Sequence, residues 1–563
     1  MNSIAGFRAV LLVFVLVLVS LVLIACSEQP VGLSPQAANE TLRDTPLGGV
    51  RGFIDAKGAY VWMGLPYAQP PVDALRWHAP RPVAAWQGQR EALAPGSACA
   101  QIGGAALKLP EDKHGMPVGS EDCLYLNIWA PPPRQTAAAL PSSSEKLPVM
   151  VWIHGGGNSV GSGSVYDGGV LATSQRVIVV SFNYRLGLFG WFQHPALHGD
   201  DASRLDRSGN YGTLDTIEAL RWVQQNIAAF GGDPDRVTVF GESAGGRNVY
   251  GLLVSPLASG LFNRAIVQSG SLRTDTFAHA SHFPDDDVAG SAHGSRAIIN
   301  RLRIAGGLAA DTEQAKRQQL AMSSEATQSY LTSQSTVDLL SVVDAQMSGM
   351  YTPPQLLRDG YVLPKEPLLD RIRRGQYNQV PFITGTNRDE YKLMLLNDPA
   401  FVTWYGPIPR VRDLQRYNQI QSYYSEHWKA LAVDEPAALM SMHQPNQIYA
   451  YRFDWDEAPR NWLVKLDELM GAAHAFELGF VFGDFTSGFD IPGLFNEDNA
   501  EGRIALSQQM MAYWGHFAHH GEPGRGKNQQ GLRWLPWSLD GEKVIEEVSK
   551  ILNVPIVYTT YMD

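Results

Sequence analysis

The sequence predicts an α/β domain with a large, mostly parallel central sheet and helices on both faces. Short apolar runs rich in β-branched residues occur at 148–153 and 177–183, and Gly-rich turns bound them, as is typical of buried parallel strands. A helical pattern follows at 213–229, where apolar residues recur every three or four positions. Strands and helices therefore alternate along the chain, which is the pattern of an α/β fold.

Further strands are expected at 237–240, 264–268 and 380–384. The segments 285–345 and 400–460 are instead polar and helical, and we expect them to be helical insertions that cap one end of the sheet. Residues 48–563 are predicted to form one domain, because a large α/β domain with insertions is compatible with a chain of 563 residues.

The composition indicates a globular protein. Hydrophobic residues make up 45% of the chain and charged residues 18%, which is more apolar surface than disordered chains contain. The net charge of −11 excludes a strongly basic surface, so no nucleic-acid partner is expected. The composition and charge do not specify an oligomeric state.

The N-terminus resembles an export signal. Residues 9–25 are apolar apart from one serine and follow a single positive charge at Arg8, which suits a signal peptide over residues 1–25. Cys26 closes a Leu-Ile-Ala-Cys segment that resembles a bacterial lipobox, in which the cysteine is acylated and becomes the mature N-terminus. Residues 26–47 would then form a flexible tether. We expect an exported lipoprotein, attached to the membrane by its lipid, at the outer membrane or in the periplasm; an uncleaved N-terminal anchor is the alternative.

Cys99 and Cys123 are the cysteines that remain, 24 residues apart. In an oxidising compartment we expect a disulfide between them, with two free buried thiols as the alternative. Such a bond would remove roughly 3–4 kcal/mol of unfolded-state chain entropy.

A candidate nucleophile follows the strand expected at 237–240. Residues 241–245 read Gly-Glu-Ser-Ala-Gly, the G-x-S-x-G pattern, between a predicted strand and a predicted helix. A sharp turn of this kind raises the serine Oγ above the sheet edge, and its glycines relieve the crowding there. Ser243 is therefore a candidate for nucleophilic attack on an acyl group.

A glycine-rich segment meets a second chemical requirement. Residues 154–157, His-Gly-Gly-Gly, directly follow the strand predicted at 148–153. Acyl transfer places negative charge on a carbonyl oxygen, which preoriented N–H groups stabilise. We expect an oxyanion hole formed by the amides of Gly156, Gly157 and Ala244; an ordinary glycine-rich turn is the alternative.

Together these motifs resemble the type-B carboxylesterase/lipase family of the α/β-hydrolase fold, which includes the cholinesterases. Other matching stretches are GLPYAQPP (64–71), SEDCLYLNIW (120–129), SFNYRLGLFGW (181–191), VQSGS (267–271), GTNRDE (385–390) and FAHHGEP (517–523). They extend over most of the chain between residues 48 and 540. The resemblance implies a serine carboxylesterase.

The resemblance also assigns two partners to Ser243. In this family the acid is the glutamate that ends a T-N-x-D-E segment, here Glu390, and the base is the histidine of G-x-x-H-x-x-E-L, here His474. The order serine, acid, histidine is the one expected of this fold. His474 would accept the Ser243 proton and Glu390 would orient the ring. This chemistry requires no metal and no organic cofactor, so none is expected.

Three positions beside these motifs need interpretation. Ala475 stands where many relatives carry glycine, and we expect the change only to alter loop freedom. Arg247 lies one helical turn beyond Ser243; its charge either approaches the pocket or pairs with a carboxylate such as Glu242, and the pairing is preferred. Ser269 matches a buried serine of the family that supports the catalytic groups.

The expected substrates are neutral esters with short to medium acyl chains. In cholinesterases a tryptophan inside the disulfide loop holds the quaternary ammonium group by a cation–π contact. The corresponding loop 99–123 contains no Phe, Tyr or Trp, so choline esters should have no advantage. Alternatives are a lipase or polyester hydrolase, an amidase, or a non-catalytic adhesion protein of the same fold. The polar insertions argue against a lipase lid, and the intact triad argues against an adhesion protein.

Overall fold

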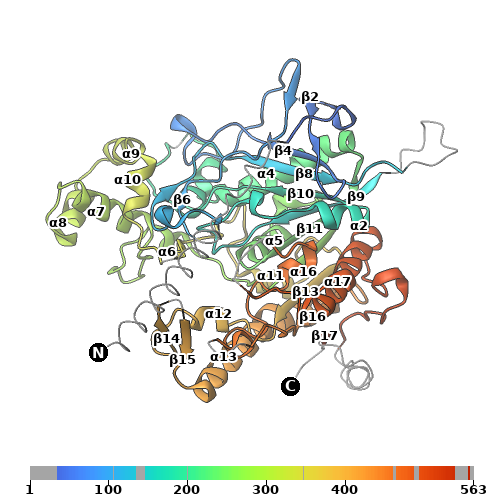
Figure 1. Ribbon diagram of the computed structural model, residues 1–563. Helices are drawn as coiled ribbons and strands as arrows, with labels where there is room; N and C mark the ends of the chain where they lie inside the picture. The colour runs from blue at the N-terminus through green and yellow to red at the C-terminus, as the bar shows by residue number, and fades with distance from the viewer. Residues whose placement is uncertain are drawn as a thin grey trace, which may run out of the picture. The chain divides into compact units, whose positions relative to one another are not determined.

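The centre of the fold is a sheet whose middle strands are parallel (Figure 1). The computed structural model describes residues 35–104, 107–134, 146–199, 201–346, 348–406, 408–460, 464–486, 493–538 and 556–557. Within them the strands of this sheet are β3 (Phe53–Ile54), β4 (Tyr60–Pro66), β8 (Tyr125–Ala130), β9 (Leu147–Ile153), β10 (Ile178–Phe182), β11 (Gly232–Glu242), β12 (Arg264–Gln268), β13 (Phe382–Asn387), β16 (Ile448–Phe453) and β17 (Ile556–Val557).

The strand order across the sheet is β17-β16-β13-β12-β11-β9-β10-β8-β4-β3. The six strands from β16 to β10 are parallel to their neighbours. The strands at the two edges pair antiparallel, through β17 at one edge and β8, β4 and β3 at the other. The predicted large and mostly parallel sheet is confirmed.

Helices cover both faces of the sheet, and the alternation of side chains along β9 shows why. Val149, Val151 and Ile153 belong to one apolar core, whereas Met150 and Trp152 belong to a second. Both sides of the strand must therefore be covered. The helices that supply the first core are α4 (Tyr211–Asn226), α5 (Ala244–Val254), α11 (Leu368–Arg373) and α14 (Glu435–His443). Those of the second are α2 (Gly169–Gln175), α16 (Leu478–Phe482) and α17 (Ala500–His520).

The remaining helices and strands lie outside the main sheet. Beyond β12 the chain forms α6 (Phe277–Ser281), α7 (Ser295–Ala305), α8 (Thr312–Leu320), α9 (Ser324–Thr332) and α10 (Thr336–Ser341). Beyond β13 it forms α12 (Lys392–Leu395), the hairpin of β14 (Val402–Tyr405) and β15 (Ile408–Val411), and α13 (Leu414–Lys429). Others are β1 (Arg43–Thr45), β2 (Gly48–Arg51), β5 (Gln89–Glu91), β6 (Gln101–Ile102), β7 (Pro117–Val118), α3 (Gly187–Gly190) and α15 (Leu466–Leu469).

The second insertion is shorter than the sequence pattern suggests. The segment 400–460, expected to lie outside the sheet, contains β16, which pairs in parallel with β13. All residues of β16 except Arg452 are buried, so the strand is an internal part of the core. Its polar flanks had suggested an insertion, but its β-branched and aromatic residues favour a strand.

The folded domain also begins earlier than residue 48. One compact unit starts at Ala37, and β1 pairs with β2. Thr41 is fully buried, and its hydroxyl accepts a hydrogen bond from the Gly52 N–H at 2.9 Å. The tether predicted over 26–47 therefore overlaps the domain. The predicted signal peptide 1–25 and Cys26 lie outside the described residues. No helix among the described residues has the length and apolarity required to cross a bilayer.

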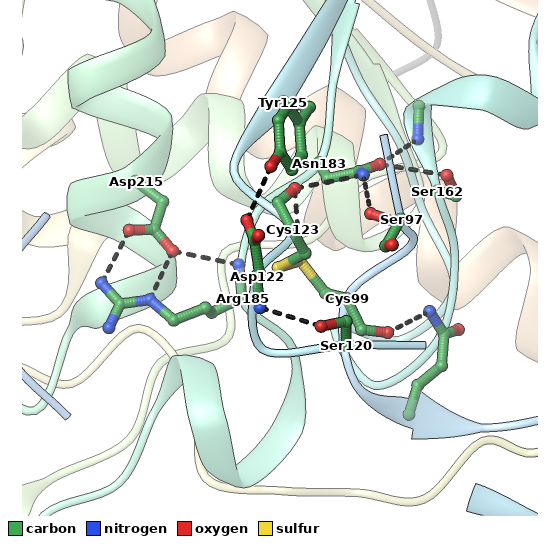
Figure 2. The surroundings of a disulfide bond; sticks show 12 residues. Ser97, Cys99, Ser120, Asp122, Cys123, Tyr125, Ser162, Asn183, Arg185 and Asp215 are labelled. Atoms are coloured by element: carbon green, nitrogen blue, oxygen red, sulfur yellow. Dashed lines mark hydrogen bonds and ion pairs between the residues drawn. A yellow bond between two sulfur atoms is a disulfide. The ribbon is translucent and has the colours of Figure 1, made fainter. Parts of the chain in front are cut away.

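Cys99 and Cys123 form the predicted disulfide, and a side chain from a distant segment braces it (Figure 2). The amide nitrogen of Asn183 donates to the carbonyl oxygens of Cys123 and Ser97, and its amide oxygen accepts from Ser162 Oγ at 3.0 Å. Both cysteines are almost completely buried. The disulfide therefore closes the 99–123 loop, and the hydrogen bonds of Asn183 tie that loop to the end of β10.

Candidate active site

Ser243 occupies the sharp turn between β11 and α5 that the motif predicts. Its backbone has φ +57° and ψ −119°, a strained conformation for a residue with a side chain. Its N–H donates to the carbonyl of Gln268, at the end of the adjacent strand β12, at 2.9 Å. A Cβ at Gly245 would lie 1.9 Å from the carbonyl oxygen of Ile153, so glycine is required where α5 begins against β9.

The glycine segment that follows β9 lies directly beside this serine. A Cβ added to Gly155 would stand 3.2 Å from Ser243 Cβ. Gly156 and Gly157 have φ values of +90° and +66°, which glycine adopts freely. In the described part of the chain, neither N–H donates to another backbone group. Ala244 is the first residue of α5, so its N–H has no intrahelical acceptor. These donors are available to an oxygen bound beside Ser243.

His154 anchors the same segment. Its ring stacks on Tyr184 with the centroids 4.4 Å apart, and the Tyr184 hydroxyl donates to the His154 carbonyl at 2.7 Å. Burial lowers the pKa of His154 to about 4, so the ring is neutral at pH 7. His154 thus fixes the loop by packing and hydrogen bonding, without adding charge.

His474 and Glu390, predicted from the family resemblance, meet on this edge of the sheet. His474 Nδ1 lies 2.5 Å from Glu390 Oε2, and both side chains are buried. Glu390 Oε1 accepts from the Asn387 N–H at 2.7 Å and from the Ser269 hydroxyl. The carboxylate is therefore held on both oxygens, and Ser269 contacts the acid as expected.

Two further buried carboxylates, which were not predicted to belong to the site, lie near the same imidazole. Glu242 Oε1 lies 3.1 Å from His474 Nε2. Glu477 accepts from Asn387 Nδ2 at 2.7 Å and Gln268 Nε2 at 3.1 Å. Glu242 directly precedes Ser243 in the G-x-S-x-G motif, and Glu477 follows His474 by three residues in the G-x-x-H-x-x-E-L motif. Their closeness in sequence to these two residues was the signal that could have identified them.

The carboxylates determine the charge of the ring. Burial alone would lower the pKa of His474, but the negative charges of Glu242 and Glu390 outweigh it and raise that pKa. Burial raises the pKa of Glu242 well above its usual value, and burial and Glu390 raise the pKa of Glu477. Three carboxylates around one imidazole cannot all be ionised at low cost. Glu390 accepts the most hydrogen bonds of the three.

In this structure the ring of His474 faces Glu242 and makes no hydrogen bond to Ser243. Glu242 Oε1 accepts no hydrogen bond from the described residues, so the 3.1 Å contact is electrostatic. The indole of Trp428 packs on the ring with centroids 5.0 Å apart, and its Nε1 donates to the Gly270 carbonyl at 2.8 Å. Catalytic hydrogen bonds are often long or absent before substrate binds.

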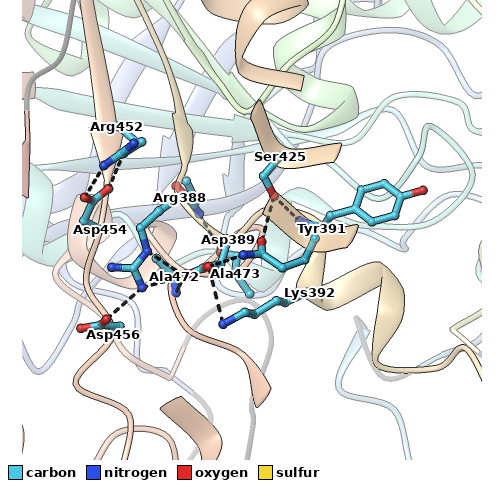
Figure 3. A network of polar contacts seen from close by, with 12 residues as sticks. Arg388, Asp389, Tyr391, Lys392, Ser425, Arg452, Asp454, Asp456, Ala472 and Ala473 are labelled. Atoms are coloured by element: carbon cyan, nitrogen blue, oxygen red, sulfur yellow. Dashed lines mark hydrogen bonds and ion pairs between the residues drawn. The ribbon is translucent and has the colours of Figure 1, made fainter. Parts of the chain in front are cut away.

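A polar network connects the loop that carries Glu390 to the loop that carries His474 (Figure 3). Asp389 precedes Glu390, and its N–H donates to the Ala472 carbonyl while its Oδ2 accepts from the Ala472 N–H, both at 3.0 Å. Arg388 and Lys392 neutralise the Asp389 carboxylate, with N–O distances of 2.7 and 3.5 Å. The positions of Glu390 and His474 are therefore set by one rigid connection.

Two expectations about neighbouring residues were wrong. Ala475 has φ +68°, a left-handed conformation that costs a residue with a Cβ roughly 1–2 kcal/mol, so the substitution strains the loop instead of only altering its freedom. Arg247 does not pair with Glu242: its Nε donates to Ser271 Oγ at 2.9 Å, and Glu242 faces His474.

Comparisons with known proteins identify the family of the chain. Residues 39–403 and 402–551 match the model of the carboxylesterase family. The chain belongs to the carboxylesterase family. Para-nitrobenzyl esterase of Bacillus subtilis (strain 168) is 34% identical over 544 residues, covering 89% of this chain and 95% of that protein. Human cocaine esterase is 32% identical over 544 residues, covering 89% and 86%.

Solved structures of carboxylesterases also resemble this one. Carboxylesterase EST55 of Geobacillus stearothermophilus superposes with a TM-score of 0.63 and 31% identity, over 89% of this chain and 94% of that chain. A para-nitrobenzyl esterase structure gives the same TM-score and identity, over 88% and 93%. This carboxylesterase therefore has the α/β-hydrolase fold and is a carboxylic ester hydrolase.

Proposed function

We propose that this esterase works through a triad of Ser243, His474 and Glu390. The observation that carries the proposal is the hydrogen bond from His474 to Glu390. It lies on the sheet edge where β9, β11 and β12 also end and where Ser243 occupies its strained turn. A buried acid that orients an imidazole beside a serine is the arrangement of a serine hydrolase.

The chemistry follows from these positions. His474 Nε2 turns from Glu242 to Ser243 and takes the Oγ proton as Oγ bonds to the ester carbonyl carbon. The N–H groups of Gly156, Gly157 and Ala244 stabilise the oxyanion. His474 then gives the proton to the leaving alcohol as the acyl-enzyme forms. Water attacks the acyl carbon, its proton passes through His474 to Ser243, and the acid is released.

The test compares two serine variants. Ser243→Ala should lose nearly all turnover of a nitrophenyl acetate, roughly a million-fold by analogy with other triads, and should lose labelling by an organophosphate. Ser259→Ala, at an exposed serine, is the matched control and should keep both. His474→Ala should lower turnover more than Glu390→Gln does. A folded Ser243→Ala protein with more than a few per cent of turnover would contradict the triad.

Between neutral and cationic esters, the proposed substrates are the neutral ones, with short to medium acyl chains. The disulfide loop 99–123 carries no aromatic ring to hold an ammonium group. The measurement is kcat/KM for acetylcholine against its isostere with carbon in place of nitrogen. A ratio above about ten in favour of the cation would contradict the proposal, because a desolvated cation–π contact is worth about 2 kcal/mol.

A lipase or polyester hydrolase is the second candidate. Trp404, Tyr405 and Tyr423 on the second insertion are 47%, 63% and 67% exposed, and exposed aromatic residues suit contact with a bulk substrate. Turnover of nitrophenyl esters from acetate to palmitate, together with a triglyceride emulsion, distinguishes the two. A rate that rises sharply above substrate solubility would favour the lipase.

We also propose that the mature protein is a lipoprotein acylated on Cys26. The support is the apolar segment 9–25 followed by the lipobox-like sequence. Mass spectrometry of the intact mature protein should find an acylated Cys26 as its first residue, and Cys26→Ser should leave the membrane fraction or stay unprocessed. An unmodified N-terminus elsewhere would contradict the assignment.

A further inference from the structure

Arg247 carries a positive charge that forms no ion pair within the described part of the chain. Its Nε donates to Ser271 Oγ at 2.9 Å, whereas its two terminal nitrogens donate to no group of the described residues. The carboxylate of Glu242 is engaged elsewhere, because it lies against His474 and Gly155. The guanidinium is therefore fixed at one end and unpaired at the other.

The surrounding charges leave Arg247 without a counter-ion. Burial and the nearby cation Arg273 lower the pKa of Arg247 to about 10, so it stays protonated at pH 7. Asp275 is the carboxylate that attracts it, but that side chain is already bound. Its Oδ1 lies 2.7 Å from His279 Nδ1, and its Oδ2 accepts from the Gln355 N–H at 3.0 Å. A largely buried cation without a partner is costly, and an anionic ligand would offset that cost.

Arg247 is close to the candidate active site along the chain and through its anchor. It stands one turn beyond Ser243 on α5, and its N–H donates to the Ser243 carbonyl at 3.0 Å. Its anchor, Ser271, follows Gly270, whose carbonyl accepts from the Trp428 indole that packs on His474. The backbone of Arg247 is thus bonded to the proposed nucleophile, and its side chain is anchored one residue from the carbonyl that holds Trp428 beside the proposed base.

We propose that Arg247 binds a carboxylate carried by the ester substrate, so that esters with a free carboxylate are preferred to neutral ones. This inference rests on the proposed function, since it assumes ester hydrolysis at Ser243. Two terminal nitrogens in one plane match the two oxygens of a carboxylate. Neutral esters then rank second, and cationic esters such as choline esters rank last.

The experiment compares substrates that differ in one charge. On the acyl side these are the 4-nitrophenyl monoester of glutarate and the corresponding ester of glutaramate, corrected for spontaneous hydrolysis. On the alcohol side they are 4-acetoxybenzoate and 4-acetoxybenzamide. The wild-type ratio of kcat/KM, carboxylate over amide, should be roughly ten to a hundred on one of the two sides, the range of a charge-assisted hydrogen bond. The side with the high ratio identifies where the carboxylate is carried.

Arg247→Gln should bring that ratio close to one, and Arg247→Lys should retain part of it. Arg273→Gln is the matched control, because Arg273 is a nearby exposed cation, and it should keep the ratio. A ratio near one in the wild type on both sides, or an unchanged ratio in Arg247→Gln, would overturn the inference.

A measurement on the wild type covers the case in which Arg247→Gln does not fold. Glutarate should inhibit hydrolysis of a neutral ester at least roughly tenfold more strongly than glutaramide, and equal inhibition would overturn the inference. Failure of the proposed function is distinguishable, because an enzyme without the triad would hydrolyse neither member of a substrate pair.

Discussion

Glu242→Gln tests whether a second carboxylate sets the working pH of this esterase. The base must be unprotonated to accept the serine proton, so kcat/KM rises as the pH passes through the pKa of His474 in the free enzyme. Glu242 raises that pKa. Removing its charge should lower the pKa of His474 and move the acid limb of the profile to lower pH.

The structure sets the size of this shift. Glu242 Oε1 lies 3.1 Å from His474 Nε2, and both side chains are buried. An opposite charge at such a distance moves a pKa by about 1–3 units. Burial raises the pKa of Glu242 itself, so part of its population is already neutral. We therefore expect a shift near the lower end, about one unit.

The assay is kcat/KM for a neutral nitrophenyl ester, corrected for spontaneous hydrolysis, between about pH 5 and 11, a range that includes the raised pKa of His474 of about 10. Glu477→Gln is the matched control, because Glu477 is equally buried but contacts Asn387 and Gln268 instead of the ring. Its acid limb should move less. An acid limb that stays within about 0.3 units in Glu242→Gln would show that Glu242 is uncharged when His474 titrates, and would refute the reasoning.

Three further outcomes concern stability. Ala475→Gly should raise the free energy of unfolding by about 1 kcal/mol, because glycine relieves the left-handed backbone; an unchanged or lower Tm would contradict this. Replacing both Cys99 and Cys123 by alanine should lower the free energy of unfolding by about 3.5 kcal/mol, measured as a lower denaturant midpoint. His154 binds its proton more weakly when folded, so the unfolded chain gains protons first as the pH falls from 6.5 towards 4. Stability should therefore decline over that range by up to about 3 kcal/mol, and His154→Gln should flatten the decline.

The sequence predicts the strands whose residues are largely apolar and buried on both faces. It misses a strand whose place in the sheet depends on pairing with a distant segment. The runs at 148–153 and 264–268 are largely apolar, and both form central strands. β16 sits between polar segments, and its place in the sheet follows from pairing with β13, which lies much earlier in the chain. The start of the domain was missed for a similar reason, since Thr41 is a polar residue that is buried and hydrogen-bonded to Gly52.

The candidate site divides in the same way. Ser243 and the glycines after β9 are identified by local sequence, because a sharp turn needs small residues at fixed positions. Glu390 and His474 are 84 residues apart, and only the family resemblance selects them. The convergence of Glu242 on the same ring depends on side-chain directions that no pattern in the chain encodes.

The candidate site combines residues from segments that are far apart in the chain. The proposed oxyanion loop follows β9, Ser243 follows β11, the proposed acid Glu390 follows β13, and the proposed base His474 comes only after β16. A chain still being synthesised contains its nucleophile, at position 243, long before it contains the proposed base at position 474. If the proposed triad is correct, hydrolysis therefore requires residues on both sides of β16, the last parallel strand along the chain.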